Sequence, residues 1–267
     1  MRNLIALFLT AWTGSAFAVG GTEAYADGKT VYGGFGLRQD NLTEVDPAHA
    51  STFRISREGA ALRFDLTAKS DVAHRLREKM KSGPVGAGWP EECFEIFLAP
   101  SGGSGFVQLA VGPGGKWDSR VREAKMDSDF TWTSEVAVGE DGWSAVVTIP
   151  FASLGVKTPA KGDKWRFNIA RDAITRNGPC ISTWAAVGGV FNNPSKFATL
   201  YLCAKDELAA AGRAKALAEA AALRKELAAK GLESEFDARL KLIEQGGPSE
   251  IATEIRDEAR VVEKMMR

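Results

Sequence analysis

The sequence predicts a mainly β domain, built as a sandwich or barrel of antiparallel strands, followed by a small helical domain. From about Val31 to Cys203, short runs rich in Val, Ile, Phe and Trp are separated by Gly, Pro, Asp and Asn, a pattern typical of strands joined by turns. After Cys203 the residues Ala, Leu, Lys and Glu dominate, and no Trp or Tyr occurs beyond Tyr201. That composition favours helices.

Antiparallel strands account for the first region. Thr52–Ile55 and Ala61–Leu66 alternate apolar with polar residues around the turn Arg57–Gly59, which predicts a hairpin. Further strands are expected at Cys93–Leu98, Phe106–Val111, Thr131–Val138, Trp143–Ile149, Trp165–Ala170, Ser182–Ala185 and Phe197–Leu202. Their even spacing favours antiparallel pairing, because parallel strands need long crossover connections. Trp143 and Trp165 stand among apolar neighbours and are expected in the core.

A short helix is expected between two of these strands. Ser70 and Asp71 provide a cap, and Val72, Leu76 and Met80 follow at helical spacing. The helix is therefore expected over Asp71–Lys81.

The C-terminal region, residues 204–267, is expected to fold as two or three helices. Gly231 and the Gly246–Pro248 triplet interrupt the helical pattern, since Gly ends a helix and Pro cannot continue one. Ser234 and Ser249 stand at expected N-cap positions.

Apolar stripes run along two of these helices. They consist of Phe236, Leu240 and Ile243 in the middle helix and of Ile251, Ile255, Ala259, Val262 and Met266 in the last. Two interpretations are open. The stripes pack on one another or on the sandwich, or they form a surface for dimerisation or for a protein partner.

Residues 1–18 have the features of a secretory signal peptide. A basic start at Arg2 precedes the apolar run Leu4–Trp12 and the small residues Ala16 and Ala18. We expect cleavage after Ala18 and a secreted or periplasmic protein. No later segment reaches the roughly 20 apolar residues of a membrane helix, so no membrane span is expected. The remaining chain divides into a β domain, 19–203, and a helical domain, 204–267.

The charge and the cysteine content of the sequence limit which nucleic-acid partners, disulfides and metal sites can be expected. Lys and Arg number 34, as do Asp and Glu, and no basic cluster is interleaved with aromatic residues, so a nucleic-acid partner is not expected. The cysteines Cys93, Cys180 and Cys203 are either buried thiols or include one disulfide. No Cys or His spacing indicates zinc.

The stretch from Gly88 to Leu98 is the most informative for function. Trp89 precedes a strand in which Glu95 stands between apolar residues. Side chains alternate between the two faces of a strand. If Phe94, Ile96 and Leu98 face the core, Glu95 faces the other way.

The sequence resembles the family 9 carbohydrate-binding modules, in which a tryptophan, five intervening residues and a strand glutamate recur. The resemblance covers nearly all of Val31–Cys203. It continues through Phe106–Gln108, Asp141–Ala145, Ile149–Phe151, Gly162–Ile169, Ser182–Trp184 and Phe191–Leu200.

The resemblance implies a jelly-roll-like sandwich that binds an oligo- or polysaccharide without cleaving it and holds a chain end between two aromatic rings. Trp89 and Phe191 match the ring positions, Glu95 the carboxylate and Gln108 a further polar contact. Trp184 ends its strand near this site and can form its floor. Pyranose C–H groups suit aromatic faces, and hydroxyl groups need fixed polar partners.

Three positions depart from the family pattern. Ala110 stands where the family has a sugar-contacting arginine, Gly188 where it has an asparagine, and Phe191 where it has a second tryptophan. These changes predict one of three outcomes: an altered specificity, weaker binding, or loss of binding.

No cofactor is required for such binding. The resemblance allows a structural calcium ion held by loop carboxylates, and five aspartates are expected in loops: Asp46, Asp127, Asp129, Asp163 and Asp172. Solvated turn residues are the simpler interpretation of these positions.

Three other functions compete. A glycosidase would need a second carboxylate near Glu95, and the sequence places no acidic strand residue opposite it. A haem-binding module would use His74 and Met80 on the expected inserted helix, where the neighbouring residues are charged. A scaffold without ligand would dock partners through the helical tail.

Overall fold

The computed structural model describes residues 19–38, 43–76, 92–101, 105–122, 130–160, 162–248 and 250–265, with the backbone alone for 117–122. The chain forms two compact units, Met1–Ala204 and Lys205–Arg267. The expected signal peptide, residues 1–18, lies outside the described residues.

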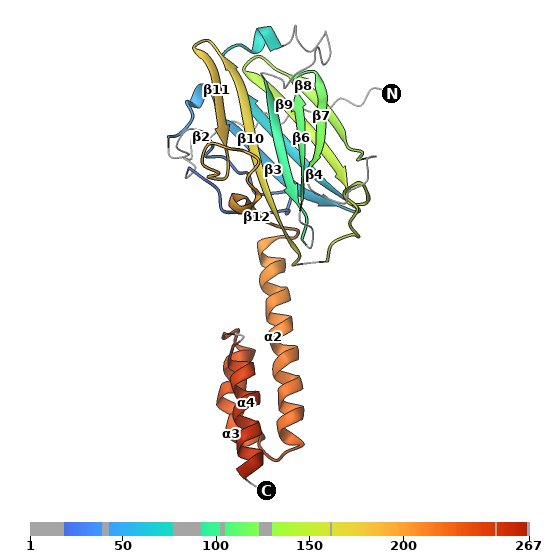
Figure 1. Ribbon diagram of the computed structural model, residues 1–267, viewed down its shortest axis with the longest axis vertical. Coiled ribbons are helices and arrows are strands. Elements are labelled where there is room, and N and C mark those ends of the chain that lie inside the picture. The colour runs from blue at the N-terminus through green and yellow to red at the C-terminus, as the bar shows by residue number, and fades with distance from the viewer. Residues whose placement is uncertain are drawn as a thin grey trace. The chain divides into compact units, whose positions relative to one another are not determined.

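An eight-stranded sheet forms one layer of the first unit (Figure 1). Its main path runs β1 (Glu23–Tyr25), β12 (Ala198–Tyr201), β10 (Lys164–Thr175), β5 (Cys93–Ala99), β6 (Phe106–Gly112) and β7 (Gly115–Arg122). β11 (Gly178–Thr183) pairs with β10 and with β2 (Gly36–Leu37). Only β1 and β12, among the described pairs, run parallel.

A four-stranded antiparallel sheet forms the second layer, in the order β3 (Ser51–Glu58), β4 (Ala61–Lys69), β9 (Gly142–Pro150) and β8 (Thr133–Val138). β4 and β9 bury alternate residues, as expected of strands with one face in the core. The core between the sheets includes Trp143 and Trp165, at 2% and 3% exposed. The predicted fold class, a mainly β sandwich followed by helices, is confirmed.

The predicted β3–β4 hairpin is present, and its turn consists of Gly59 and Ala60 between the paired residues Glu58 and Ala61. Gly59 has φ 58°, a value that glycine adopts without steric cost. Short 3-10 turns complete the unit at Pro47–His49, Ala152–Leu154 and Pro194–Lys196.

Several strands differ from the expectation. The sequence predicts none of β1, β2 and β7. β10 continues past Ala170 to Thr175, and β11 spans Gly178–Thr183 and not Ser182–Ala185. β1 and β2 have only three and two residues, and β7 and β11 contain glycine and polar residues, so no run of apolar residues indicates these strands.

The expected helix over Asp71–Lys81 is described in its first part. Ala73–Leu76 are helical, and Val72 and Leu76 are buried at 1% and 0% exposed. Residues 77–81 lie outside the described residues.

The second unit consists of α2 (Lys205–Ala228), α3 (Glu233–Glu244) and α4 (Glu250–Met265). As predicted, α2 ends shortly before Gly231 and α3 shortly before Gly246. These glycines have φ values of 70° and 86°. Phe236, Leu240, Ile243, Ile255 and Ala259 pack in one cluster with residues of α2. The stripes therefore pack on one another, as the first interpretation predicted.

The expected N-cap at Ser234 is wrong. α3 begins at Glu233, and the cap residue is Leu232, which has no capping side-chain bond and is fully buried. Leu232 belongs to the buried cluster of the helical unit. Ser249 and Met266 lie outside the described residues.

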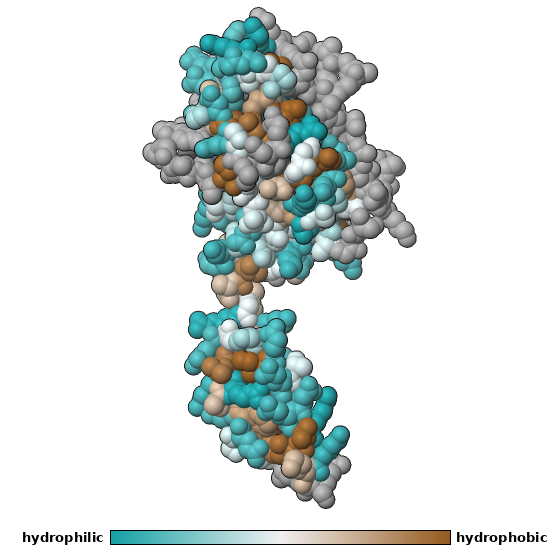
Figure 2. Space-filling view, turned by 60° about the vertical axis from the view of Figure 1, so that its left-hand side comes forward, coloured by the Kyte–Doolittle hydropathy of each residue, from teal (hydrophilic) through white to brown (hydrophobic). Residues whose placement is uncertain are grey.

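The surface of the helical unit is largely hydrophilic on the face in Figure 2, with hydrophobic patches among the charged side chains. Val261 and Met265 are 57% and 81% exposed. None of the helices in the described part of the chain combines the length and apolar composition that a membrane span needs.

Candidate functional site

The outer face of β5 carries the predicted carboxylate. Phe94, Ile96 and Leu98 belong to the core, so strand alternation places Cys93, Glu95 and Phe97 on the opposite face of the sheet. Glu95 is 4% exposed. Its orientation away from the interior of the sandwich follows the alternation predicted from the sequence.

Gln108 lies beside Glu95 on the next strand, β6, where it pairs with Phe97. Its Nε2 donates a hydrogen bond of 2.6 Å to Oε2 of Glu95. Its Oε1 is buried and accepts no hydrogen bond. The structure thus brings two predicted site residues together, with one acceptor still available.

Asp172 is a second carboxylate beside Glu95, on β10. It pairs with Cys93, and a side-chain hydrogen bond links it to Glu95. Burial raises the pKa of Asp172, although this hydrogen bond and the charges of Arg38 and Arg171 act against the rise. Burial likewise holds the pKa of the Cys93 thiol well above its ordinary value, with the charge of Asp172 next in effect.

The expectation that no acidic strand residue faces Glu95 is therefore wrong. The sequence predicts a loop at Asp172, because the apolar pattern of this strand stops at Ala170. The strand continues to Thr175, and Asp172 falls on the same face as Ala170, directly beside β5.

Phe191 borders this face. Its ring contacts that of Phe97 at 6.3 Å between centroids in an edge-on arrangement, and Phe97 stands two residues from Glu95 on the same face. The guanidinium carbon of Arg38 lies 5.3 Å from the Phe191 centroid, and Arg38 Nε donates to the carbonyl of Gly189 at 2.5 Å. No pattern in the sequence indicates that Arg38 belongs to this site.

Trp184 does not lie on this face. It is 3% exposed, its Nε1 donates to the Gly33 carbonyl at 3.0 Å, and its ring meets that of Phe53 edge-on at 5.1 Å. A Cβ at Gly21 would stand 2.0 Å from the indole. This placement favours a packing role over contact with a ligand.

Three further positions of the predicted sugar site are Trp89, Ala110 and Gly188. Trp89 lies outside the described residues. Ala110 pairs with Glu95 on β6 and is fully buried. Gly188 has φ 68°, and a Cβ there would lie 3.0 Å from Nζ of Lys196.

Glu92 faces the interior between the sheets. Its carboxylate accepts hydrogen bonds from Trp143 Nε1 at 2.6 Å and from the Ile174 amide at 2.8 Å, and it forms an ion pair with Arg171. Arg171 also lies over the rings of Phe94 and Trp143. These bonds join the start of β5 to β10, and so hold Cys93 and Asp172 side by side.

Solved structures similar to this chain include family 9 carbohydrate-binding modules. One, from Caldicellulosiruptor kristjanssonii in complex with cellotriose, is 15% identical, with a TM-score of 0.46 over 69% of this chain and 95% of that one. A second, from the same organism with glucose, is 14% identical, with a TM-score of 0.45 over 67% and 94%. The strand order described above, rather than these similarities, establishes the sandwich. No family model and no curated protein matches the chain.

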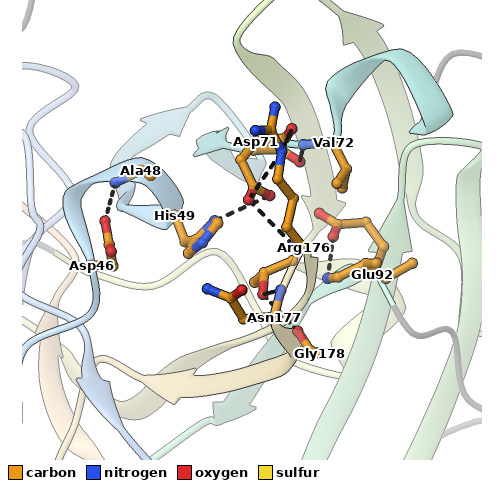
Figure 3. Close-up of polar contacts among 12 residues, drawn as sticks. Asp46, Ala48, His49, Asp71, Val72, Glu92, Arg176, Asn177 and Gly178 are labelled. Carbon is orange, nitrogen blue, oxygen red and sulfur yellow. Dashed lines mark hydrogen bonds and ion pairs between the residues drawn. The ribbon is translucent and has the colours of Figure 1, made fainter.

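A second polar cluster lies near the turn between β10 and β11 (Figure 3). His49 Nδ1 stands 3.8 Å from Asp71 Oδ1, and Arg176 donates its backbone amide to Asp71 Oδ2 at 3.3 Å and its Nε to the Asp71 carbonyl at 3.2 Å. Asp71 immediately precedes the helical turn that leads towards Trp89 in the sequence. The cluster therefore links Asp71 to the turn between β10 and β11.

Of the aspartates expected in loops, Asp46 and Asp163 have turn roles, whereas Asp172 lies on β10. Asp46 accepts from the Ala48 amide at 2.8 Å and caps a 3-10 turn. Asp163 accepts from the Ala160 amide at 2.7 Å. Asp127 and Asp129 lie outside the described residues, and calcium binding remains an expectation from the resemblance.

Proposed function

We propose that the sandwich unit is a non-catalytic module that binds an oligo- or polysaccharide on the outer face of its larger sheet. One observation carries the proposal. The hydrogen-bonded pair of Glu95 and Gln108 lies on the face that Phe191 borders. A sugar needs this combination of fixed polar groups for its hydroxyls and an aromatic surface for its C–H faces.

Each side chain has a distinct proposed role. Glu95 accepts hydrogen bonds from sugar hydroxyls, and the buried Gln108 Oε1, which has no donor, accepts another. Satisfying a buried acceptor is favourable, because leaving it unpaired costs about 1–3 kcal/mol. Arg38 holds the Phe191 ring in place through its contact with that ring.

Trp89 supplies the second ring in this proposal, and a chain end lies between it and Phe191. Each ring contact is expected to contribute about 1–2 kcal/mol, so dissociation constants of micromolar to millimolar order follow. The changes at Ala110, Gly188 and Phe191 favour the weaker end of this range.

The contacts and the spacing of the carboxylates favour sugar binding over sugar hydrolysis. Glu92 is engaged by Arg171 and Trp143 in the interior. Glu95 and Asp172 have oxygens within 4.8 Å of one another and share a hydrogen bond, whereas glycosidases separate their two carboxyl groups by about 5 Å or more across the substrate.

Export by residues 1–18 is part of the proposal. If the signal peptide is cleaved after Ala18, mass spectrometry of the protein purified from its native host will find an N-terminus at Val19. An intact Met1 in the mature protein would contradict this part.

The binding proposal is tested with a glycan array, followed by calorimetry on the best ligand. Trp89→Ala and Phe191→Ala are each expected to weaken binding about tenfold, and Glu95→Gln by a similar factor. Matched controls are Glu135→Gln on the exposed side of β8 and Val190→Ala, at a side chain 55% exposed. Equal affinity of wild type and the three site variants would overturn the assignment of the site.

A further inference from the structure

We propose that Cys93, Glu95 and Asp172, together with the side-chain carbonyl of Gln108, bind a divalent cation of the zinc class on the outer face of the larger sheet. This inference goes beyond carbohydrate binding, although it shares Glu95 and Gln108 with the proposed sugar site.

The geometry brings four ligand groups together from three neighbouring strands. Cys93 and Asp172 pair across β5 and β10, and Glu95 follows on the same face of β5. One ligand atom from each of these three residues lies within 4.8 Å of the others, and Cys93 Sγ stands 4.0 Å from Asp172 Oδ2.

These separations suit a shared metal ion after small side-chain rotations. Zinc binds sulfur at about 2.3 Å and oxygen at about 2.0–2.2 Å, which places neighbouring ligand atoms roughly 3–4 Å apart. The strand pairing fixes the Cα positions, so the side chains can reach a common ion without movement of the backbone.

Gln108 gives an independent indication of a ligand. The residue is 9% exposed, and its Oε1 is buried without a hydrogen-bond donor. The side-chain amide of Gln108 already contacts one of the three ligand residues, because its Nε2 donates a hydrogen bond to Glu95. Rotation of the amide would turn Oε1 towards the ion and provide a fourth ligand, and would release Glu95 Oε2 for the metal.

The donor set selects the kind of ion. Calcium and magnesium prefer ligand shells made entirely of oxygen, whereas a thiolate among oxygen ligands suits zinc and metals of similar softness. Binding of the ion would release the Cys93 proton to solvent, and the divalent charge would offset the repulsion between the resulting thiolate, the buried Glu95 and the half-buried Asp172. This site therefore differs from the loop calcium that the sequence resemblance allows.

The test uses the full chain, freed of metal with a chelator and titrated with Co²⁺ at neutral pH. Binding to Cys93 is expected to produce a thiolate-to-cobalt charge-transfer band in the near ultraviolet, and Zn²⁺ should abolish the band by displacement. Cys93→Ser is expected to remove the band. Cys203→Ser, which alters another buried thiol, should leave it unchanged.

Asp172→Asn provides a second variant that keeps the thiol, and is expected to weaken cobalt binding at least tenfold. Asp257→Asn, an exposed change on α4, is its control. Circular dichroism confirms that each variant is folded. No charge-transfer band in the wild type, or the same band in Cys93→Ser, would overturn the proposal.

The result is separable from the proposed sugar binding. Glycan affinity is measured on the same samples with chelator and with Zn²⁺, and Cys93→Ser is expected to bind glycan as well as the metal-free wild type. Cobalt binding without any glycan binding would contradict the carbohydrate proposal alone, and glycan binding without a cobalt band would contradict the metal site alone.

Discussion

Arg171 and Glu92 form an ion pair inside the sandwich, where their side chains are 1% and 2% exposed. The carboxylate also accepts from Trp143 and from the Ile174 amide, and two aromatic rings flank the guanidinium. Such a pair is costly to break, because removing one partner leaves an uncompensated charge in the interior.

Glu92→Gln is therefore expected to lower the free energy of unfolding by about 3–5 kcal/mol, although the amide can still accept from Trp143. Urea unfolding followed by tryptophan fluorescence measures the loss. The double variant Glu92→Gln, Arg171→Met removes both charges and is expected to recover part of the stability. A double variant less stable than the single one would contradict this explanation.

Trp184→Phe separates packing from ligand contact. The change removes the hydrogen bond to Gly33 and part of a buried ring, so we expect a loss of about 1–3 kcal/mol in unfolding free energy. Glycan affinity should stay within about twofold of wild type. A tenfold loss of affinity with normal stability would return Trp184 to the binding site.

Gly142 stands where no other residue fits. It has φ 155°, and a Cβ there would lie 1.9 Å from the Ala68 carbonyl oxygen on β4. Gly142→Ala is expected to destabilise the sandwich by more than about 1 kcal/mol, because the backbone of the β4–β9 pair must shift. Gly139→Ala is the matched control, since its Cβ would meet its nearest neighbour at 3.7 Å. Thermal unfolding of the two variants compares them directly, and equal unfolding temperatures would refute the clash.

In the helical unit, a buried and an exposed leucine on the same helix can be compared. Leu240 is fully buried and Leu242 is 48% exposed, two residues apart on α3. Leu240→Ala is expected to cost about 2–5 kcal/mol, whereas Leu242→Ala should change stability by less than about 0.5 kcal/mol. Chemical denaturation followed by the helical circular-dichroism signal measures both. A large effect at Leu242 would show that this surface is covered in solution.

Tyr25 gives a pH-dependent signal. Burial, followed by the hydrogen bond and charge of Glu23, raises its pKa from 10.0 to about 12. The folded state therefore holds the phenol proton more tightly than the unfolded state. The resulting stabilisation is complete below pH 10.0 and is lost as the pH rises through about 12. Ultraviolet titration should show tyrosine ionisation in this range, and Glu23→Gln should lower the pKa of Tyr25. No change in Glu23→Gln would assign the shift to burial alone.

Much of the sandwich was predictable, because strand period and turn residues act locally. The face of Glu95 follows from the apolar residues on either side of it, and the helix ends follow from Gly231 and Gly246. These features require no knowledge of distant contacts.

The rest of the site depends on pairing between distant strands. Asp172 stands beside Glu95 because β10 pairs with β5, yet its polar neighbours resemble those of a loop. Arg38 contacts the ring of Phe191 and donates a hydrogen bond to the Gly189 carbonyl, 151 residues away along the chain. No local sequence pattern predicts such contacts. The packing of Trp184 has a related cause, since its position in the sequence does not show which distant residues, Gly21 and Phe53 among them, surround its ring.

The parallel pairing of β1 with β12 has a consequence for synthesis of the chain. The ribosome makes Glu23–Tyr25 early, but its partner, Ala198–Tyr201, is among the last parts of the sandwich to emerge. Until then the β1 backbone has no β12 to pair with, so this edge of the sheet cannot close during translation of the intervening residues. Pairing at this edge therefore requires that all residues from Glu23 to Tyr201 have already been made.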